Sequence, residues 1–258
     1  MYMKSQGTFI IGTDTEIGKT TIAAGFAHLL KEKGYNVGVM KPVATGSKKY
    51  SDKFKSLDTK ILITAAGNKE ADDFINPFFY KIPSAPYLAT KILLNSSKID
   101  LNSIKKKYME LEKKYDFMIV EGIGGVMVPL SRDQYVANLA ERLNLPIIIV
   151  MSNKIGTLNH VIMTAIMCKN FKLEILGIVI NNTVQVDDKK FKKINDFLPE
   201  VVQDLTGLEI LAVVPFFNKP SPPQTSVFLE KVFKKKAEEG PIPPSMDEPA
   251  KTNGPTSA

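Results

Sequence analysis

Cysteine, histidine and tryptophan are scarce in this chain of 258 residues, which holds one cysteine, two histidines and no tryptophan. The single cysteine, Cys168, excludes a disulfide framework and a cysteine-rich zinc site. No apolar run approaches the roughly 20 residues that span a bilayer, and the N-terminus enters a strand-like run without the apolar segment of a signal peptide. These absences predict a soluble, cytoplasmic protein that does not cross a membrane.

Acidic residues are outnumbered by basic ones. The chain has 34 Lys and Arg residues against 27 Asp and Glu residues, a formal net charge of +7. The lysines are scattered in short clusters, such as 105–107 and 113–114, which is typical of solvated helix faces. We therefore predict no nucleic-acid partner, although the excess charge would attract polyanionic nucleotides.

The most informative segment is 13–20, TDTEIGKT, which follows the apolar run 8–12. A strand that ends in glycine and feeds a helix directs backbone amides and the positive end of the helix at one point, where a polyphosphate binds. Lys19 would reach the terminal phosphates, and the Thr20 hydroxyl would ligate Mg²⁺ beside them. The segment therefore predicts a nucleotide-binding protein.

This phosphate loop is a variant of the usual pattern. Five residues separate Gly12 from Gly18, and Thr13 stands at the position where a glycine is expected. The amphipathic stretch 22–30 nevertheless supplies the helix that a phosphate loop requires.

Short β-branched runs alternate with helix-length segments along the chain. Near-continuous apolar strands separated by helices are typical of a parallel sheet covered on both faces, with ligands at the carboxyl ends of the strands. We predict one α/β domain over 1–236, with a P-loop NTPase-like fold and a mostly parallel central sheet. The predicted strands are 9–11, 37–40, 117–120, 147–151, 175–180 and 210–214.

The composition changes near the C-terminus. The segment 237–258 is rich in proline and holds little that could form a core, so we predict a disordered tail. Before it, apolar residues alternate with lysines over 227–236, as in a short basic amphipathic helix. Such a helix can lie on a membrane, or it can dock on the sheet as the last helix of the domain.

Lys41 follows the predicted strand 37–40 and precedes a loop, 42–46, that proline and glycine restrict. It would project from the carboxyl end of its strand toward the same crevice as Lys19, so that two cations face one triphosphate. The alternative is an ordinary solvated lysine at a strand end.

Two carboxylates complete a predicted magnesium site. Glu121 ends the strand 117–120, where nucleotide hydrolases and kinases keep a metal-holding acid. Asp58 opens a predicted helix, where its alternative role is an N-cap. Because Mg²⁺ keeps several waters, Thr20, Asp58, Glu121 and the phosphates would suffice as ligands.

Two further segments follow predicted strands. The segment 156–160, GTLNH, starts a helix whose free amides can hold a carboxylate, unless it is only a helix cap. Asn181 and Asn182 could contact a base edge or cap a loop, since a carboxamide both donates and accepts. A guanine-binding Asn-Lys-x-Asp arrangement begins at Asn153 but lacks the aspartate, so adenine is favoured.

Over residues 7–217 the chain resembles the dethiobiotin synthetase family. Four motifs follow in the family's order: 12–20 (GTDTEIGKT), 41–46 (KPVATG), 121–125 (EGIGG) with Pro129 and Leu130, and 156–160 (GTLNH). The resemblance implies an ATP-dependent ligase of biotin biosynthesis. In its reaction, 7,8-diaminononanoate takes up CO₂ as a carbamate, the carbamate attacks the γ-phosphate of ATP, and the second amine closes the resulting anhydride to dethiobiotin.

The resemblance also implies residue roles. Lys41 would bridge the carbamate and the γ-phosphate, and Lys19 would hold the β- and γ-oxygens, as the catalytic pair. A homodimer is implied, in which the amides at 157–159 hold the substrate carboxylate across the interface. The implied ATP contacts are Glu16, Ile17, Gly18, Lys19, Thr20, Thr21, Asp58, Glu121, Gly122, Ile123, Gly124, Asn181, Asn182, Pro215, Phe216 and Phe217, and the implied contacts to the diamine or its carbamate are Thr15, Thr45, Thr157, Leu158 and Asn159.

Two other classes of protein have similar phosphate loops. Switch ATPases of plasmid partitioning and septum positioning bind membranes or DNA, and the basic segment 227–236 suits them. They carry a lysine early in the loop, however, where this chain has Asp14. Related ligases that act on a cobalamin precursor or a small diacid usually need an ammonia-generating domain, for which this chain has no room.

Overall fold

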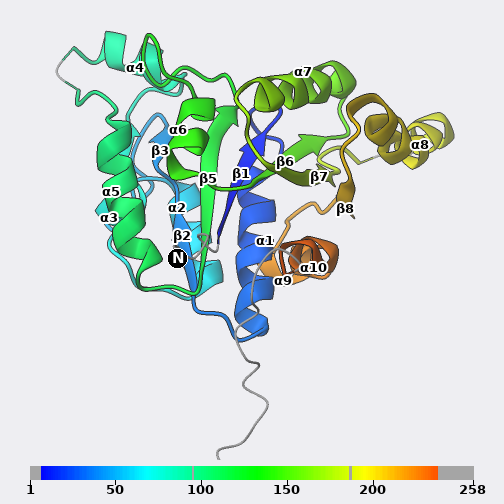
Figure 1. Ribbon diagram of the computed structural model, residues 1–258, viewed down its shortest axis with the longest axis horizontal. Coiled ribbons are helices and arrows are strands. Elements are labelled where there is room, and N and C mark those ends of the chain that lie inside the picture. Colours follow the sequence, from blue (N-terminus) through cyan, green and yellow to red (C-terminus); the bar gives the residue numbers. More distant parts are fainter. Residues whose placement is uncertain (1–6, 95, 186–187, 238–258) are drawn as a thin grey trace, which may run out of the picture.

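The protein is built on a parallel sheet with helices on both faces (Figure 1). The computed structural model describes residues 7–94, 96–185 and 188–237. The strand order is β2-β5-β1-β6-β7-β8, and every neighbouring pair is parallel. The fold class and the six predicted strands are thus confirmed. These strands are β1 (Gly7–Gly12), β2 (Val37–Met40), β5 (Phe117–Gly125), β6 (Ile147–Ser152), β7 (Ile175–Asn181) and β8 (Ile210–Val214).

The sheet is buried on both faces because its strands are nearly all apolar. Helices α1, α2 and α10 cover one face, and α5, α6, α7 and α8 cover the other. The helices are α1 (Lys19–Glu32), α2 (Leu57–Ala66), α3 (Asp72–Ile75), α4 (Pro86–Ile92), α5 (Leu101–Glu112), α6 (Val136–Leu143), α7 (Thr157–Asn170), α8 (Lys189–Thr206), α9 (Pro222–Ser226) and α10 (Glu230–Ala237).

A second, small sheet was not predicted from the sequence. Strands β3 (Val43–Thr45) and β4 (Phe78–Tyr80) pair in parallel beside the main sheet. We expected a loop at 42–46, because a strand of three residues is too short to give a periodic signal. Each of the two strands begins just after a proline, Pro42 or Pro77.

Strand β5 continues past the acid that was expected to end it. Its pairing with β1 runs from Met118 to Glu121, shifts by a bulge and resumes at Gly125. Gly124 absorbs the bulge with a left-handed φ of 57°, a conformation that favours glycine. Glu121 is therefore held inside a strand, which fixes its carboxylate more firmly than a loop would.

The basic segment near the C-terminus docks on the domain. Within it, α10 buries Val232 and packs Phe233 against Tyr35, with ring centroids 6.0 Å apart. Glu230 forms an ion pair of 3.1 Å with Lys33, the C-cap residue of α1. The docking alternative is therefore confirmed for α10, whereas the predicted tail lies, from residue 238 onward, outside the described residues.

A membrane-spanning segment is not found in the part of the chain that the structure describes. None of its helices is both long enough and apolar enough to cross a bilayer.

Candidate active site

The phosphate loop lies between β1 and α1, at the carboxyl edge of the sheet. Gly18 caps α1 with a φ of 88°, and a side chain there would collide with Asn181. Gly18 provides no side-chain cap, and the first intrahelical bond runs from the Ile22 amide to the Gly18 carbonyl at 3.0 Å. The amides of the first helical turn therefore point outward without intrahelical acceptors, which is the arrangement that binds an anion.

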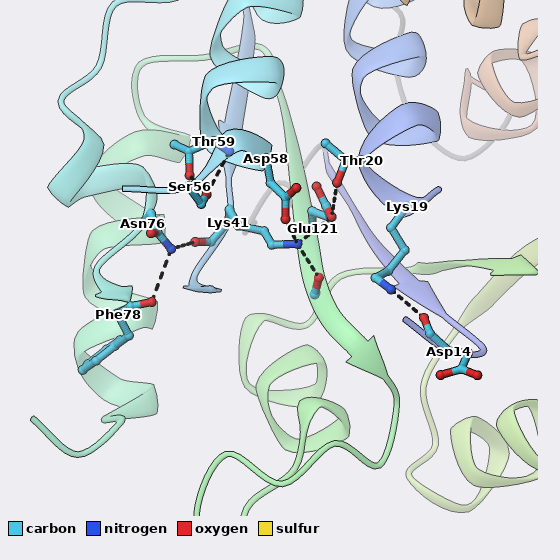
Figure 2. A network of polar contacts seen from close by, with 11 residues as sticks. Asp14, Lys19, Thr20, Lys41, Ser56, Asp58, Thr59, Asn76, Phe78 and Glu121 are labelled. Carbon is cyan, nitrogen blue, oxygen red and sulfur yellow. Dashed lines mark hydrogen bonds and ion pairs between the residues drawn. The ribbon is translucent and has the colours of Figure 1, made fainter. Parts of the chain in front are cut away.

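Lys19 folds back over this loop (Figure 2). Its ammonium donates to the Asp14 carbonyl at 2.7 Å, and the residue is 7% exposed. Burial, followed by the nearby positive charge of Lys41, lowers the pKa of Lys19 to about 8. A phosphate at the loop would favour the charged form of this lysine.

Lys41 lies at the centre of the polar network shown in Figure 2. Its ammonium contacts Glu121 Oε1 at 2.6 Å, Asp58 Oδ2 at 3.0 Å and the Gly122 carbonyl at 3.0 Å. Lys41 is 3% exposed and Glu121 is 1% exposed. The alternative of a solvated lysine at a strand end is therefore wrong.

The register of the sheet explains this contact. Strand β2 pairs with β5 so that Met40 lies opposite Val120, which brings the next residues, Lys41 and Glu121, side by side at the sheet edge. Asp58 approaches from the first turn of α2. Ser56 caps that helix, with its Oγ accepting from the Thr59 amide at 3.1 Å, so the N-cap alternative for Asp58 is wrong.

The pKa shifts follow from this burial and pairing. Burial alone would lower the pKa of Lys41, but the charges and hydrogen bonds of Glu121 and Asp58 outweigh it and raise the pKa. The charge of Lys41 lowers the pKa of Asp58 against the effect of burial. Burial raises the pKa of Glu121, while Lys41 and a hydrogen bond from Thr20 favour its ionised form.

The three residues predicted to hold Mg²⁺ gather at this point. The Thr20 hydroxyl donates to Glu121 Oε1 at 2.8 Å, and Asp58 and Glu121 both contact the Lys41 ammonium. Glu121 Oε2 is buried and has no hydrogen-bond partner among the described residues. A hydroxyl and two carboxylates are hard oxygen donors of the kind that Mg²⁺ prefers, so the set fits this ion.

A pocket of about 340 Å³ lies beside the phosphate loop. It is bordered by the phosphate loop, by the end of β7 and by the segment after β8. Asn181 donates from its amide to the Ile17 carbonyl at 2.9 Å and so ties β7 to the loop. The lining residues are Glu16, Gly18, Thr21, Asn181, Asn182, Thr183, Pro215, Phe216, Phe217, Asn218 and Pro220.

Asn181 and Asn182, which were predicted to contact the base, thus line one pocket with six more of the sixteen residues predicted to contact ATP. Sequence reasoning missed Thr183, Asn218 and Pro220. Thr183 directly follows the two predicted asparagines, and that adjacency was a usable signal.

A smaller pocket, of about 80 Å³, holds part of the predicted substrate set. Thr15 and Thr157 both line it, together with Asp14 and His160. His160 Nδ1 lies 3.8 Å from Asp14 Oδ2 at this pocket.

At the helix start 157–159, the amide and the hydroxyl of Thr157 already have hydrogen-bond partners within the chain. The Thr157 amide donates to the Lys154 carbonyl at 3.2 Å, and its hydroxyl donates to the Ser152 carbonyl at 2.7 Å. The amides of Leu158 and Asn159 belong to the first helical turn, where no intrahelical acceptor exists.

Several predicted residues line neither pocket. Thr45 ends β3 in the small sheet, Gly122, Ile123 and Gly124 lie on β5, and Leu158 and Asn159 lie in the first turn of α7. The Gly122 carbonyl accepts from Lys41.

Comparison with known proteins agrees with this geometry. A family model described as an AAA domain matches residues 6–224. The ATP-dependent dethiobiotin synthetase BioD of Nitrosopumilus maritimus is 39% identical over 227 residues, covering 88% of this chain and 94% of that protein. The enzyme of the same name from Bacillus subtilis strain 168 is 37% identical over 211 residues, covering 81% and 87%.

Solved structures share the fold at lower identity. The cell division ATPase MinD of Pyrococcus furiosus has a TM-score of 0.57 at 17% identity, covering 92% of this chain and 100% of that chain. The septum site-determining protein MinD of Pyrococcus horikoshii, complexed with Mg-ADP, has a TM-score of 0.50 at 19% identity, covering 91% and 95%. The switch ATPases therefore match in fold alone, and the sequence relatives do not favour that alternative.

Proposed function

The chain belongs to the ATP-dependent dethiobiotin synthetase family, and on that premise we propose that it converts 7,8-diaminononanoate, CO₂ and ATP into dethiobiotin, ADP and phosphate. Members of this family are ligases of biotin biosynthesis that use ATP. The observation that carries the proposal is the buried Lys41, held by Asp58 and Glu121 beside the phosphate loop that contains Lys19.

The proposed reaction has three steps. One amine of the diamine adds to CO₂ and loses a proton, which gives a carbamate. A carbamate oxygen then forms a bond to the γ-phosphorus while the bond to the ADP oxygen breaks, giving a carbamic-phosphoric anhydride. The second amine attacks the carbonyl carbon, and phosphate leaves as the cyclic urea closes.

The protein's part in this chemistry is to position the reactants and neutralise charge. We propose that the Lys41 ammonium bridges the carbamate and the γ-phosphate. Lys19, at the start of α1, can turn from the Asp14 carbonyl to the β- and γ-oxygens. Both lysines are shielded from water, which strengthens their attraction for a phosphate.

We propose Thr20, Asp58 and Glu121 as the residues that hold Mg²⁺. When bound, this ion would neutralise part of the phosphate charge.

We place the adenine in the 340 Å³ pocket, against Phe216 and Phe217 and within reach of the Asn181 and Asn182 carboxamides. Flat aromatic side chains suit a base, and a carboxamide can donate to one base atom and accept from another.

We place the diamine near Thr15 and Thr45, with its carboxylate at the Leu158 and Asn159 amides of a second subunit. Ile155, next to that helix start, is 91% exposed, and Ile166 of α7 is 51% exposed. We propose these two exposed apolar side chains as contacts of the interface between the subunits. Light scattering should accordingly give a mass near twice 28.6 kDa.

The test is a reconstituted reaction. Purified protein with ATP, Mg²⁺, the diamine and isotopically labelled bicarbonate should release phosphate and form dethiobiotin that carries the label in its urea carbon, as measured by mass spectrometry. Reactions that omit the diamine or the bicarbonate are the controls. Phosphate release that does not depend on the diamine would reject the proposal.

A further inference from the structure

We infer that Asn76 is a positioning residue for Lys41, an inference that rests on the proposed function. Asn76 lies between α3 and β4 and is fully buried, at 0% exposed. Its side-chain amide donates to the Lys41 carbonyl at 2.7 Å and to the Phe78 carbonyl at 3.3 Å (Figure 2). Nothing in the sequence marks this asparagine, which is far from the motifs that identify the site.

The need for this contact comes from the residue after Lys41. Because Pro42 has no N–H, the Lys41–Pro42 peptide has only one hydrogen-bonding group, the Lys41 carbonyl. That carbonyl accepts from Asn76. Asn76 therefore provides the hydrogen bond that holds this peptide plane, which is attached to the Cα atom of Lys41.

Strand pairing cannot replace Asn76 at this point. The main-sheet pairing of β2 ends at Met40, and the small-sheet pairing of β3 begins at Val43. Two backbone bonds flank the gap, from the Lys41 amide to the Ile75 carbonyl at 3.0 Å and from the Phe78 amide to the Pro42 carbonyl at 3.2 Å. Neither fixes the peptide between Lys41 and Pro42.

Asn76 is itself held in place from the other side. Its own carbonyl precedes Pro77 and accepts from the Lys55 ammonium at 3.0 Å. Lys55 lies in the segment that leads into α2, and its amide donates to Asp72 Oδ2 at 3.2 Å. Lys55 therefore connects Asn76, which bonds the Lys41 backbone, to the segment before α2, the helix that carries Asp58.

The unfavourable free energy of burying the Asn76 side chain also argues for a specific role. Its Oδ1 is buried and accepts no hydrogen bond from the described residues. A buried carboxamide with an unpaired oxygen is unfavourable for stability, so simple packing would be served better by an apolar residue.

A matched control contacts the other end of strand β2. Asn68 also donates from its side chain to a carbonyl of β2, that of Val37 at 3.4 Å, and its Oδ1 is likewise buried and unpaired among the described residues. It lies at the end of β2 remote from the site. Asn68→Ala therefore removes the same kind of bond without touching Lys41.

The experiment compares Asn76→Ala with Asn68→Ala. We expect kcat to fall on the order of 100-fold in Asn76→Ala, since a shift of about 1 Å at reacting groups has that effect. Its ADP affinity should be unchanged, and Asn68→Ala should keep the wild-type kcat. An unchanged kcat in folded Asn76→Ala, or an equal loss in Asn68→Ala, would overturn the inference.

A second measurement does not depend on activity. Acetylation of lysines, followed by mass spectrometry, should show faster labelling of Lys41 in Asn76→Ala, with Lys19 unchanged as the internal reference. Faster labelling of both lysines would indicate a general loss of stability and overturn the inference. If the wild type forms no dethiobiotin, the proposed function fails, while the labelling still tests Asn76.

Asn76→Asp keeps the shape of the side chain and serves if Asn76→Ala does not fold. As a carboxylate it cannot donate to either carbonyl, so we expect the same effects on kcat and labelling. Failure of both variants to fold would overturn the inference, because the role of Asn76 would then be structural.

Discussion

Replacing Lys41 by methionine should separate catalysis from stability in this protein. Lys41→Met keeps most of the length of the side chain but removes the ammonium that contacts Glu121 at 2.6 Å and Asp58 at 3.0 Å. Glu121, at 1% exposed, would remain as a buried carboxylate without its cation. Catalysis would lose the charge that we propose stabilises the transferring phosphoryl group.

The loss of catalysis and the loss of stability differ in size, and a second substitution should restore only the stability. Loss of one preorganised donor at a transition state typically lowers kcat on the order of 100- to 1,000-fold. Removal of one member of a buried ion pair costs about 3–5 kcal/mol. For a domain of this size, each kcal/mol corresponds to about 2–4 °C, so the melting temperature should fall by roughly 6–20 °C.

A second substitution tests the reasoning. Lys41→Met combined with Glu121→Gln removes the stranded charge, so it should recover much of the melting temperature measured by calorimetry while kcat stays low. The loop amides, Lys19 and the proposed Mg²⁺ ligands remain in Lys41→Met, so its Kd for ADP should change little. A double variant that melts below Lys41→Met, or a Lys41→Met enzyme with wild-type kcat, would refute the roles assigned to this pair.

Three further predictions concern the nucleotide, the metal and the core. Asn181→Ala removes the side-chain amide that donates to the Ile17 carbonyl. The affinity for ADP should therefore fall roughly 2- to 12-fold, as for one hydrogen bond worth about 0.5–1.5 kcal/mol. An unchanged affinity in calorimetry would contradict this. Thr20→Val keeps the shape but not the hydroxyl that donates to Glu121, so turnover should need more Mg²⁺, and a Mg²⁺ titration that matches the wild type would exclude Thr20 as a ligand. Burial raises the pKa of the Cys168 thiol to about 12, so a dithiobis-nitrobenzoate reagent near neutral pH should label it only after unfolding in guanidinium; rapid labelling of the folded protein would contradict its burial.

The parts of the site that the sequence predicted are those encoded within one short segment. The phosphate loop needs only a strand, Gly18, Lys19, Thr20 and a helix in succession, and the structure has them in that order. The parallel sheet was equally predictable, because its apolar strands alternate with helices along the chain.

The contacts that hold Lys41 could not be predicted in the same way. They require β2 to pair with β5, a strand about 80 residues away, in the register that sets Met40 opposite Val120. The sequence contains no local signal for that pairing. It placed Lys41 and Glu121 at strand ends facing one crevice, but not in contact with each other.

Asn76 shows most clearly what could not be predicted from the sequence. A lone asparagine before a proline resembles a turn residue, and its role depends on the gap between β2 and β3, two strands that belong to different sheets. Only the folded backbone shows that the peptide after Lys41 has a single hydrogen bond available to it.

The balance of charge in the site explains why the ligand should be a magnesium nucleotide rather than a free one. The cations Lys19 and Lys41 equal the anions Asp58 and Glu121 in number, although only Lys41 contacts these carboxylates, so these four groups together carry no surplus positive charge. A triphosphate adds several negative charges to a site with little access to water, where unbalanced charge is costly. The helix amides at the phosphate loop offset part of that charge. A divalent cation held by the two carboxylates and Thr20 would supply the remainder and free Lys41 to contact the transferring phosphoryl group.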